Sequence, residues 1–403
     1  MDIADKEHPY ADKEHPYDEL DVRKVINGSA TLTMLGGSIM PPPVLEAMAA
    51  AAQHFVDIDE LQEKVGQKIA EWTHNQAAYV SCGAAAGMVL STAACIAGMD
   101  PEKRARLPFT DGMRNEIIVH KRGRVGYDFA IRQAGGCLVE IGTQAGATVE
   151  DLEAAIGGRT AAIFVFYKNL FMDGQIPLEQ QIAVAQKHNI PVVVDAAAQL
   201  PPVENLWRFT HLGADLALFS GGKGLCGPQS SGLILGRRDL IQALAFNACP
   251  RPFIGRPMKA GKEEIVGLMA AVRWYLDLDH AALLQEYEDR VAWVISAFAE
   301  PKPTPHITAR RSFPSEAGQP HPRAEIIFDT LALGISRDEI LRRLYQGDPA
   351  ISLASGGQES AGESSVFINP QTLKPGEEKI IVSRIKAIMK TQSSPKTAFS
   401  QGL

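Results

Sequence analysis

A lysine in a glycine-rich turn is the residue of this sequence best suited to covalent chemistry. Two glycines precede Lys223 and one follows it, in a turn that comes directly after the apolar run Leu216–Ser220. A lysine held there loses solvent around its ammonium group, which lowers its pKa and makes it a nucleophile toward carbonyl groups. For any single lysine a solvated surface position is the common alternative. The neighbouring glycines favour the first interpretation, because they let another group approach the backbone closely.

An aspartate stands at the end of a second apolar run. Asp195 closes the run Pro191–Asp195, and Gln199 follows four residues later. A carboxylate buried at the end of a strand requires a cation or hydrogen-bond donors to stay charged. A helix N-cap or a loop ion pair explains such an aspartate equally well when the strand is considered alone.

A turn of small residues precedes an apolar helix in the N-terminal half. Gly83, Ala84 and Ala85 follow the run Tyr79–Ser81. Small residues at a helix N-terminus expose backbone N–H groups that bind a phosphate, although tight helix packing also demands them. The turn matches neither the Walker A pattern nor the dinucleotide-binding glycine pattern.

Together the three features predict a site for pyridoxal 5′-phosphate. The helix start would receive the phosphate, Asp195 would pair with the pyridinium nitrogen, and Lys223 would form an aldimine with the aldehyde and later move protons. Lys223 lies 28 residues after Asp195 (223 − 195). The order of phosphate turn, aspartate and lysine along the chain is more specific than any one of them.

Alternating strand and helix patterns position these residues. Apolar runs in which polar residues do not alternate with apolar ones predict strands buried on both faces. Such runs are found at Glu116–His120, Cys137–Ile141, Ala161–Phe166 and Gly232–Leu235. Helical patterns at Tyr127–Ala134, Val149–Ile156 and Leu178–His188 separate them. The pattern predicts an α/β fold with a three-layer αβα large domain, a mostly parallel sheet and ligands at the carboxyl ends of its strands.

The predicted domain organisation has four parts. Residues 1–20 contain a direct duplication of 4–10 at 11–17 and are expected to be a mobile arm. Residues 21–260 form the cofactor-binding large domain, and residues 261–390 form a smaller α+β domain. A long helix at Lys262–Leu278, expected to continue to Phe298, joins the two domains and is followed by a loop at Pro301–Pro322. Residues 391–403 are expected to be a disordered tail.

Composition excludes several classes of protein. The chain has 403 residues, 45% of them apolar and 22% charged, which excludes disorder over most of its length. Its net charge of −7 argues against DNA and anionic membranes as partners. The apolar stretch Ala84–Met99 is too short for a membrane span and is expected to be a core helix. Five scattered cysteines predict neither a disulfide framework nor a metal site, and a cytoplasmic location is expected.

The sequence resembles the aspartate aminotransferase superfamily of pyridoxal phosphate enzymes. Within it, the chain is most similar to the branch of seryl-tRNA selenium transferases (selenocysteine synthases) and D-glucosaminate-6-phosphate ammonia-lyase-like proteins. The resemblance runs from Val25 to Met389 and rests on Val25–Asn27, Tyr79–Gly87, Val193–Gln199, Ser220–Gln229, Gly255–Glu264 and Ile368–Pro370.

The resemblance implies a role for each matched residue. Lys223 would be the Schiff-base lysine and Asp195 the partner of the ring nitrogen. The phosphate would be bound by Gly83, Ala84, Ala85 and Ser220, and Gln199 would bond the phenolic oxygen of the ring. One of His120, Arg124 and Tyr127 would cover the far face of the ring, a choice that the sequence leaves open. Such enzymes build their sites at a dimer interface, so a homodimer or a larger homo-oligomer is expected.

Several residues are candidates for binding a small anionic amino-acid-type substrate. The basic residues Arg251, Arg256 and Lys259 cluster before the long helix, where they could bind a carboxylate or phosphate or form ion pairs. Arg124, Thr31 and Ser38 are further candidates. Gly222, Gly224 and Cys226 depart from the lysine turn typical of selenium transferases, and the polar stretch before Val22 is shorter than their N-terminal module. Both departures argue against tRNA as a substrate.

The favoured function is that of a lyase of amino acid metabolism. Lys223 would remove the α-proton of a small amino acid or amino-sugar acid, and β-elimination would give a 2-oxo acid and ammonia. The alternatives are a racemase or aldolase of a small amino acid, and a selenium transferase acting on seryl-tRNA. A binding or regulatory protein that has kept the fold is the non-enzyme alternative, and the presence of Lys223 and Asp195 argues against it.

Overall fold

The computed structural model describes residues 16–168, 172–299, 305–356 and 363–392, which divide into two compact units. The large unit contains residues 31–283 and 314–321. The small unit contains the described parts of 1–30, 284–313 and 322–403. The division after residue 283 falls inside helix α12 (His280–Ala299), so this helix contributes residues to both units.

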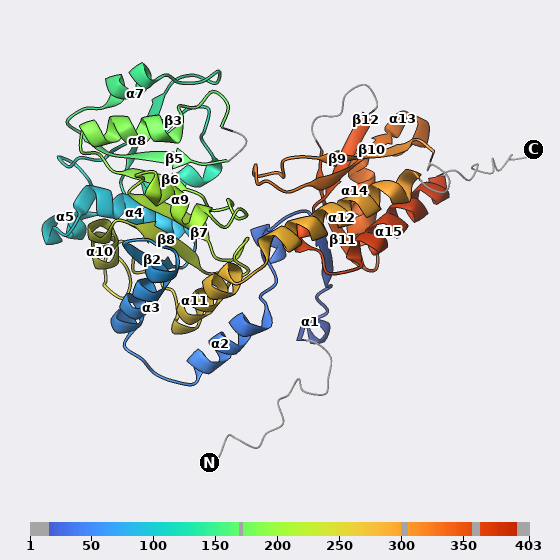
Figure 1. Cartoon of the computed structure of the whole chain (residues 1–403), viewed down its shortest axis with the longest axis horizontal. Helices are drawn as coiled ribbons and strands as arrows, with labels where there is room; N and C mark the ends of the chain where they lie inside the picture. Colours follow the sequence, from blue (N-terminus) through green and yellow to red (C-terminus); the bar gives the residue numbers. More distant parts are fainter. Residues whose placement is uncertain (1–15, 169–171, 300–304, 357–362, 393–403) are drawn as a thin grey trace, which may run out of the picture. The chain divides into compact units, whose positions relative to one another are not determined.

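The large unit is built on a seven-stranded, mostly parallel sheet (Figure 1). In sheet order its strands are β2 (Ala77–Ser81), β8 (Gly232–Gly236), β7 (Leu216–Ser220), β6 (Val192–Asp195), β5 (Thr160–Phe166), β3 (Glu116–His120) and β4 (Cys137–Ile141). Every pairing is parallel except the two made by β8. The carboxyl ends of the other six strands therefore meet along one side of the sheet, here termed the carboxyl edge.

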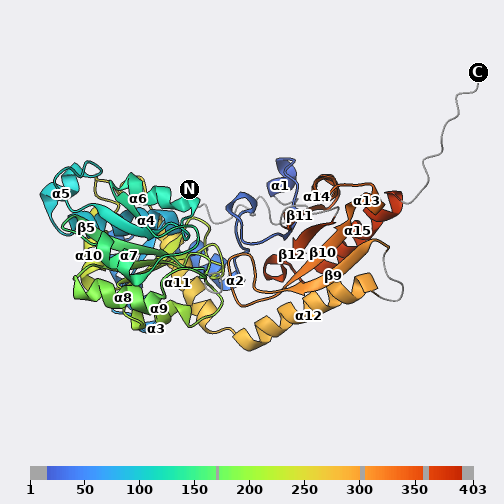
Figure 2. The same ribbon diagram turned by 90° about the horizontal axis from the view of Figure 1, so that it is seen from above.

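Helices cover both faces of this sheet, as the apolar runs predicted. One apolar cluster joins the sheet to α2 (Pro42–Ala52), α3 (Ile58–Trp72), α7 (Val149–Ala155), α8 (Leu178–Lys187), α9 (Asn205–His211) and α11 (Lys262–Leu276). A second cluster joins the opposite face to α4 (Ala84–Ala97), α6 (Phe129–Gln133) and α10 (Arg238–Asn247). Figure 2 shows α4 and α6 on one side of the sheet and α8 and α9 on the other. The predicted three-layer αβα architecture is confirmed.

The small unit is a five-stranded mixed sheet with helices. Its strands in sheet order are β1 (Val25–Gly28), β11 (Ala350–Ser355), β12 (Glu363–Ile368), β10 (Arg323–Asp329) and β9 (Ile307–Ser312). A single core contains residues of these strands, of α12, of α14 (Arg337–Gln346) and of α15 (Glu377–Gln392). The short helices α1 (Pro16–Glu19) and α13 (Thr330–Leu333) also belong to this unit. This arrangement confirms the expected smaller α+β domain.

The observed units differ from the expected boundaries at 20 and 260. Residues 21–30 join the small unit because β1 pairs in parallel with β11, with Val25 opposite Ala350. Residues 261–283 stay in the large unit because buried residues of α11, such as Leu268, pack in the core that contains Val44 of α2. Pairing and packing therefore move both boundaries away from the points where the sequence pattern changes.

Two local expectations after residue 260 are corrected by the structure. The helix predicted at Lys262–Leu278 is α11, but its expected continuation to Phe298 is a separate helix, α12, which begins where Asp279 accepts a hydrogen bond from the Ala282 N–H. That side chain acts as an N-cap, which starts a new helix and does not continue the old one. The predicted loop at 301–322 contains β9, which pairs antiparallel with β10.

The predicted mobile arm and tail fall mostly outside the described residues. Residues 1–15 and 393–403 are not among them, and neither are 301–304 of the predicted loop. Ala84–Met99, expected to be a core helix, contains the largely buried α4. In the part of the chain that the structure describes, no helix is long and apolar enough to cross a membrane.

Candidate cofactor site

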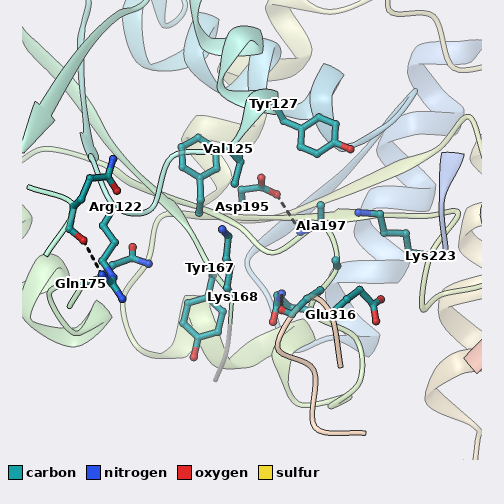
Figure 3. Close-up of a pocket in the computed structure, with 15 residues that line it drawn as sticks. Arg122, Val125, Tyr127, Tyr167, Lys168, Gln175, Asp195, Ala197, Lys223 and Glu316 are labelled. Atoms are coloured by element: carbon teal, nitrogen blue, oxygen red, sulfur yellow. Dashed lines mark hydrogen bonds between the residues drawn. The ribbon is translucent and has the colours of Figure 1, made fainter. Parts of the chain in front are cut away.

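Lys223 and Asp195 line one cavity of about 640 Å³ at the carboxyl edge (Figure 3). Asp195 is the last residue of β6, and Lys223 lies three residues beyond β7, the neighbouring strand. The register places Asp195 opposite Leu218 of β7. Figure 3 shows the Lys223 amino group pointing toward the Asp195 carboxylate. Both residues therefore lie where the sequence predicted the chemistry.

Burial controls the charge of both groups. Asp195 is 9% exposed, and its Oδ1 accepts a hydrogen bond from the Ala197 N–H at 3.0 Å. Burial raises the pKa of Asp195, whereas this hydrogen bond and the nearby Lys223 lower it. Burial lowers the pKa of Lys223, and the carboxylates of Asp195 and Glu316 oppose that shift. Lys223 is therefore biased toward the neutral amine that nucleophilic attack requires.

Close packing fixes the turn that carries Lys223. A Cβ on Gly224 would lie 2.5 Å from the Leu200 carbonyl oxygen, and one on Gly222 would lie 2.8 Å from the Gln229 Cα. Ser38, a candidate substrate ligand in the sequence, donates a hydrogen bond from Oγ to the Gly222 carbonyl at 3.0 Å. Ser38 therefore holds the lysine turn in place.

The predicted phosphate-binding turn is the open N-terminus of α4. Its N-cap is Gly83, which has a φ of 143°, and no side chain caps the helix. A Cβ on Gly83 would meet nothing within 4 Å, whereas one on Gly232 would lie 2.8 Å from the Ala84 nitrogen. Gly232 is opposite Ser81 on one side and Ser220 on the other. The register thus brings the start of α4 and Ser220 to the same end of the sheet.

These residues fit pyridoxal phosphate on several independent points. The start of α4 offers backbone N–H donors at the same end of the sheet, although neither its residues nor Ser220 line the cavity, and the cavity contains an aspartate and a desolvated lysine. Gln199 lines the cavity, and its Oε1 is buried without a hydrogen-bond partner among the described residues. A buried acceptor without a partner indicates a missing donor, which a ligand can supply. When bound, the cofactor would supply an electron sink for charge at the substrate α-carbon.

The three candidates for covering the ring face have different surroundings. Tyr127 is 68% exposed and lines the cavity together with Val125. His120 ends β3, is 5% exposed and is not among the cavity-lining residues, and burial lowers its pKa. Arg124 forms ion pairs with Asp128 and Glu140. Of the three, Tyr127 has the side chain that reaches the cavity.

The other predicted substrate-binding residues do not line this cavity. Arg251 pairs with Asp59 at 3.0 Å and lines a second cavity of about 920 Å³. Arg256 donates weakly to the Cys249 Sγ at 3.9 Å, and Lys259 is exposed. Thr31 is buried at the start of the large unit.

Sequence reasoning missed three charged residues of the cavity wall. Arg122 lies two residues beyond β3 and Lys168 two residues beyond β5, so the rule about strand ends could have found both. Figure 3 shows them on the side of Asp195 away from Lys223. Glu316 comes from the segment 314–321, more than 90 residues after Lys223, and no local pattern marks it.

Metal chemistry was not expected from the sequence. Within the described ranges, no group of three or more His, Cys, Asp or Glu side chains is arranged to hold a metal ion.

A family model described as L-seryl-tRNA selenium transferase (SelA) matches residues 123–284. L-seryl-tRNA(Sec) selenium transferase of Nitratidesulfovibrio vulgaris is 28% identical over 284 residues, covering 64% of this chain and 57% of its own length. The similarity to these transferases is thus partial, and it includes the lysine turn.

Two relatives match over nearly the whole chain. D-glucosaminate-6-phosphate ammonia lyase of Salmonella typhimurium is 33% identical over 378 residues, covering 92% of this chain and 96% of the relative. The 5′-C-glycyluridine monooxygenase-decarboxylase of a Streptomyces species is 32% identical over 379 residues, covering 92% and 91%. Relatives of nearly equal identity thus carry names of different reactions.

Solved structures agree with the fold. A structure of D-glucosaminate-6-phosphate ammonia-lyase has a TM-score of 0.80 at 32% identity, covering 94% of this chain and 99% of that one. A serine palmitoyltransferase with pyridoxal phosphate has a TM-score of 0.56 at 14% identity, covering 91% and 88%, and supports the fold alone. From the match along 92% of its length, this chain belongs to the SelA-type family of pyridoxal phosphate enzymes that includes D-glucosaminate-6-phosphate ammonia lyase.

Proposed function

We propose that this chain is a pyridoxal phosphate-dependent lyase. Its substrate is a small anionic amino-acid-type molecule such as an amino-sugar acid, and its products are a 2-oxo acid and ammonia. The observation that carries the proposal is the cavity in which Lys223 points toward Asp195 while Arg122 and Lys168 stand on the opposite side. The name of the relative matched at 33% identity, an ammonia lyase of an amino-sugar acid, supports the same reaction type.

Each residue has a task that its surroundings support. The start of α4 and Ser220 bind the cofactor phosphate, and Asp195 keeps the ring nitrogen protonated. Lys223 Nζ takes the α-proton of the substrate, which it can accept because burial favours its neutral form. Tyr127 lies over the cavity and excludes water from one of its sides.

The cations opposite Lys223 favour an anionic substrate. Neither Arg122 nor Lys168 forms an ion pair among the described residues, and Arg122 donates a hydrogen bond to the Gln144 carbonyl at 2.7 Å. Cations without a protein counter-ion in a cavity wall attract carboxylate or phosphate groups. Arg122 and Lys168 therefore replace Arg251, Arg256 and Lys259 as the proposed substrate anchors.

We also propose that two copies of the chain associate. The segment 32–55 of the large unit exposes Leu32, Met34, Ile39, Leu45 and Phe55, and Phe55 is fully accessible. Such a gathering of exposed apolar side chains in one segment is typical of a protein interface. Sedimentation of the purified chain tests this proposal: a monomer at micromolar concentration would contradict it.

The test of the proposed function separates cofactor binding from reaction type. Purified protein would be loaded with pyridoxal phosphate, and its visible absorption recorded beside a Lys223→Ala variant. Borohydride should fix the cofactor covalently to the peptide containing Lys223. Lack of a cofactor band in the wild type would overturn the enzyme proposal in favour of a binding protein with this fold.

The reaction is then assigned with loaded enzyme and a panel of substrates. D-glucosaminate 6-phosphate and the two enantiomers of serine are assayed for release of 2-oxo acid and ammonia. The proposal expects both products in equal amounts. Exchange of the α-proton in heavy water without 2-oxo acid would support a racemase instead, and release of an aldehyde would support an aldolase.

A further inference from the structure

Two glutamines join the segment 314–321 to the residues that follow β6 by reciprocal hydrogen bonds. Gln199 donates from Nε2 to the Ala317 carbonyl at 2.9 Å, and Gln319 donates from Nε2 to the Leu200 carbonyl at 3.2 Å. Both glutamines and Leu200 are almost fully buried. Loss of the Gln319 bond would therefore leave a carbonyl without a donor in a place that water does not reach. We term this pair of bonds the glutamine clamp.

A further bond fixes the orientation of the Gln319 amide. The buried Ser315 hydroxyl donates to the Gln319 Oε1 at 2.5 Å. The amide oxygen therefore faces a donor, whereas the amide nitrogen faces the Leu200 carbonyl, which is an acceptor. An amide turned end over end would place two oxygens against each other. The segment itself thus determines that Leu200 receives a hydrogen-bond donor.

The carbonyl that Gln319 holds is also in contact with the lysine turn. A Cβ added to Gly224 would lie 2.5 Å from the Leu200 carbonyl oxygen and 2.8 Å from the Leu200 Cβ. Gly224 follows Lys223 directly, so the backbone that packs on Leu200 is the backbone that carries the lysine. The two glycines before Lys223 pack against residues 229–231 instead. Leu200 therefore supports the turn on a side that those residues do not reach.

We infer that Gln319 is a positioning residue for Lys223, which acts through the Leu200 carbonyl and keeps the nucleophile in its place at the cavity. The inference rests on the proposed function for the chemistry of Lys223, and it adds a residue 96 positions later (319 − 223) that does not line the cavity. Gln319 makes and breaks no bond to substrate or cofactor in this role.

The expected consequence of losing the clamp follows from the burial of Lys223. A Leu200 carbonyl without its donor would turn toward water, and the surface under Gly224 would move with it. Water would then reach the Lys223 amine. Because burial is the largest influence on the pKa of Lys223 and lowers it, hydration should raise this pKa toward the ordinary 10.5. The other titratable side chains that line the cavity are Asp195, Glu316, Arg122, Lys168, Tyr127 and Tyr167.

The test measures the reactivity of Lys223 in the cofactor-free full chain. The pH dependence of its modification by an amine reagent is followed by peptide mass spectrometry. Gln319→Leu removes the donor while keeping a similar volume, and should shift the profile to higher pH by about half a unit or more. Ser315→Ala removes only the bond that orients the amide, and should give a smaller shift in the same direction. Wild-type profiles in both variants would overturn the inference.

A matched glutamine separates positioning from a general loss of stability. Gln181 of α8 is fully buried, and its Nε2 donates to the Ile176 carbonyl at 2.8 Å, away from the cavity lining. Gln181→Leu therefore also leaves a carbonyl without its donor, and should lower the unfolding midpoint in urea much as Gln319→Leu does. It should leave the Lys223 profile unchanged. Equal shifts in the two variants would overturn the inference.

The comparison is repeated without the charge at position 316. Glu316 lies in the segment that carries Gln319, and its carboxylate raises the pKa of Lys223, so a displaced segment changes two influences at once. In a Glu316→Gln background the route through Leu200 is intact, and Gln319→Leu should still shift the profile to higher pH. A shift that vanishes in this background would assign the effect to Glu316 and overturn the inference.

Turnover by the cofactor-loaded chain gives an independent readout. Gln319→Leu should lower kcat by about tenfold and change KM by less than about twofold, because the position of the nucleophile matters most in the transition state. A wild-type kcat in this variant would overturn the inference. If the loaded wild type releases no 2-oxo acid, the proposed function fails, whereas the profiles of the cofactor-free protein still decide whether Gln319 positions Lys223.

Discussion

The lysine turn and the start of α4 lie at the same end of one sheet but differ in how they are built. In the lysine turn, Cβ atoms added to Gly221 and Gly224 would lie 2.0 Å from the Ser231 Oγ and 2.5 Å from the Leu200 carbonyl oxygen. At the start of α4, one added to Gly83 would meet nothing within 4 Å, and Ala85 is exposed. Packing therefore determines where Lys223 lies, whereas the helix start is left open for a ligand.

The largest expected effect concerns the group that the packed turn positions. Lys223→Ala should reduce kcat by on the order of 10³-fold or more, because the nucleophile and the proton acceptor are lost together. The measurement is single-turnover release of 2-oxo acid by loaded enzyme. The unfolding midpoint in urea should not fall, since the buried amine is removed. An active variant would place the chemistry on another residue.

The second prediction tests whether packing fixes the turn. Gly224→Ala puts a methyl group against the Leu200 backbone and should lower the free energy of unfolding by about 1–3 kcal/mol. Urea denaturation measures the loss. Gly157→Ala is the control, because a Cβ there meets nothing within 4 Å. Equal stability of the two variants would contradict the packed description of the turn.

The third prediction tests the open helix start. Ala85→Asp places a negative charge in the first turn of α4, which the helix dipole tolerates or favours. Stability should therefore be unchanged, whereas affinity for pyridoxal phosphate should fall by about tenfold or more through repulsion of its phosphate. Equilibrium dialysis measures the affinity. Undiminished affinity would remove the start of α4 from the phosphate site.

A smaller effect is expected where the N-terminal segment supports the lysine turn. Ser38→Ala removes the hydrogen bond to the Gly222 carbonyl and should cost about 1 kcal/mol of unfolding free energy. Thr33→Ala, at an exposed position of the same segment, is the matched control. If both variants are equally stable, Ser38 does not support the turn.

The prediction with the smallest expected effect concerns the pH dependence of Lys223. Because burial lowers the pKa of Lys223, its amine in cofactor-free protein should react at lower pH than an ordinary lysine with a pKa of 10.5. Asp195→Asn should shift the profile further down, since the aspartate raises this pKa. The folded state binds fewer protons than the unfolded state, so this group makes the protein more stable as pH rises toward 10.5. Peptide mass spectrometry measures the modification, with the other lysines as internal references.

The fold and the centre of the site could be predicted from local sequence because both depend on it. Apolar runs without alternation mark strands buried on both faces, and their ends carry Asp195 and the lysine turn. The order of these elements then determines which residues meet at the carboxyl edge. The break between α11 and α12 was missed because the capping Asp279 lies inside a continuous helical pattern.

The outer parts of the site depend on contacts between distant residues. Glu316 reaches the cavity only because Gln199 and Gln319 anchor its segment. Hydrogen bonds between such distant residues leave no repeating pattern in the sequence. Arg251 looked like a substrate ligand in the sequence, yet a partner 192 positions away, Asp59, binds it. Local patterns therefore indicate which residues can do chemistry, and long-range pairing decides which of them do so.

The pairing of β1 with β11 has a consequence for synthesis on the ribosome. Val25 lies opposite Ala350, a separation of 325 residues (350 − 25), so one of the first strands to be made must wait for one of the last. Residues 31–283 can collapse earlier, but the wall that contains Glu316 is added only after 314–321 have been made. Pairing of strands that are so far apart in the sequence is slow, and the edges of the strands stay unpaired until it happens. The growing chain is therefore exposed to aggregation at β1 until its C-terminal strands emerge.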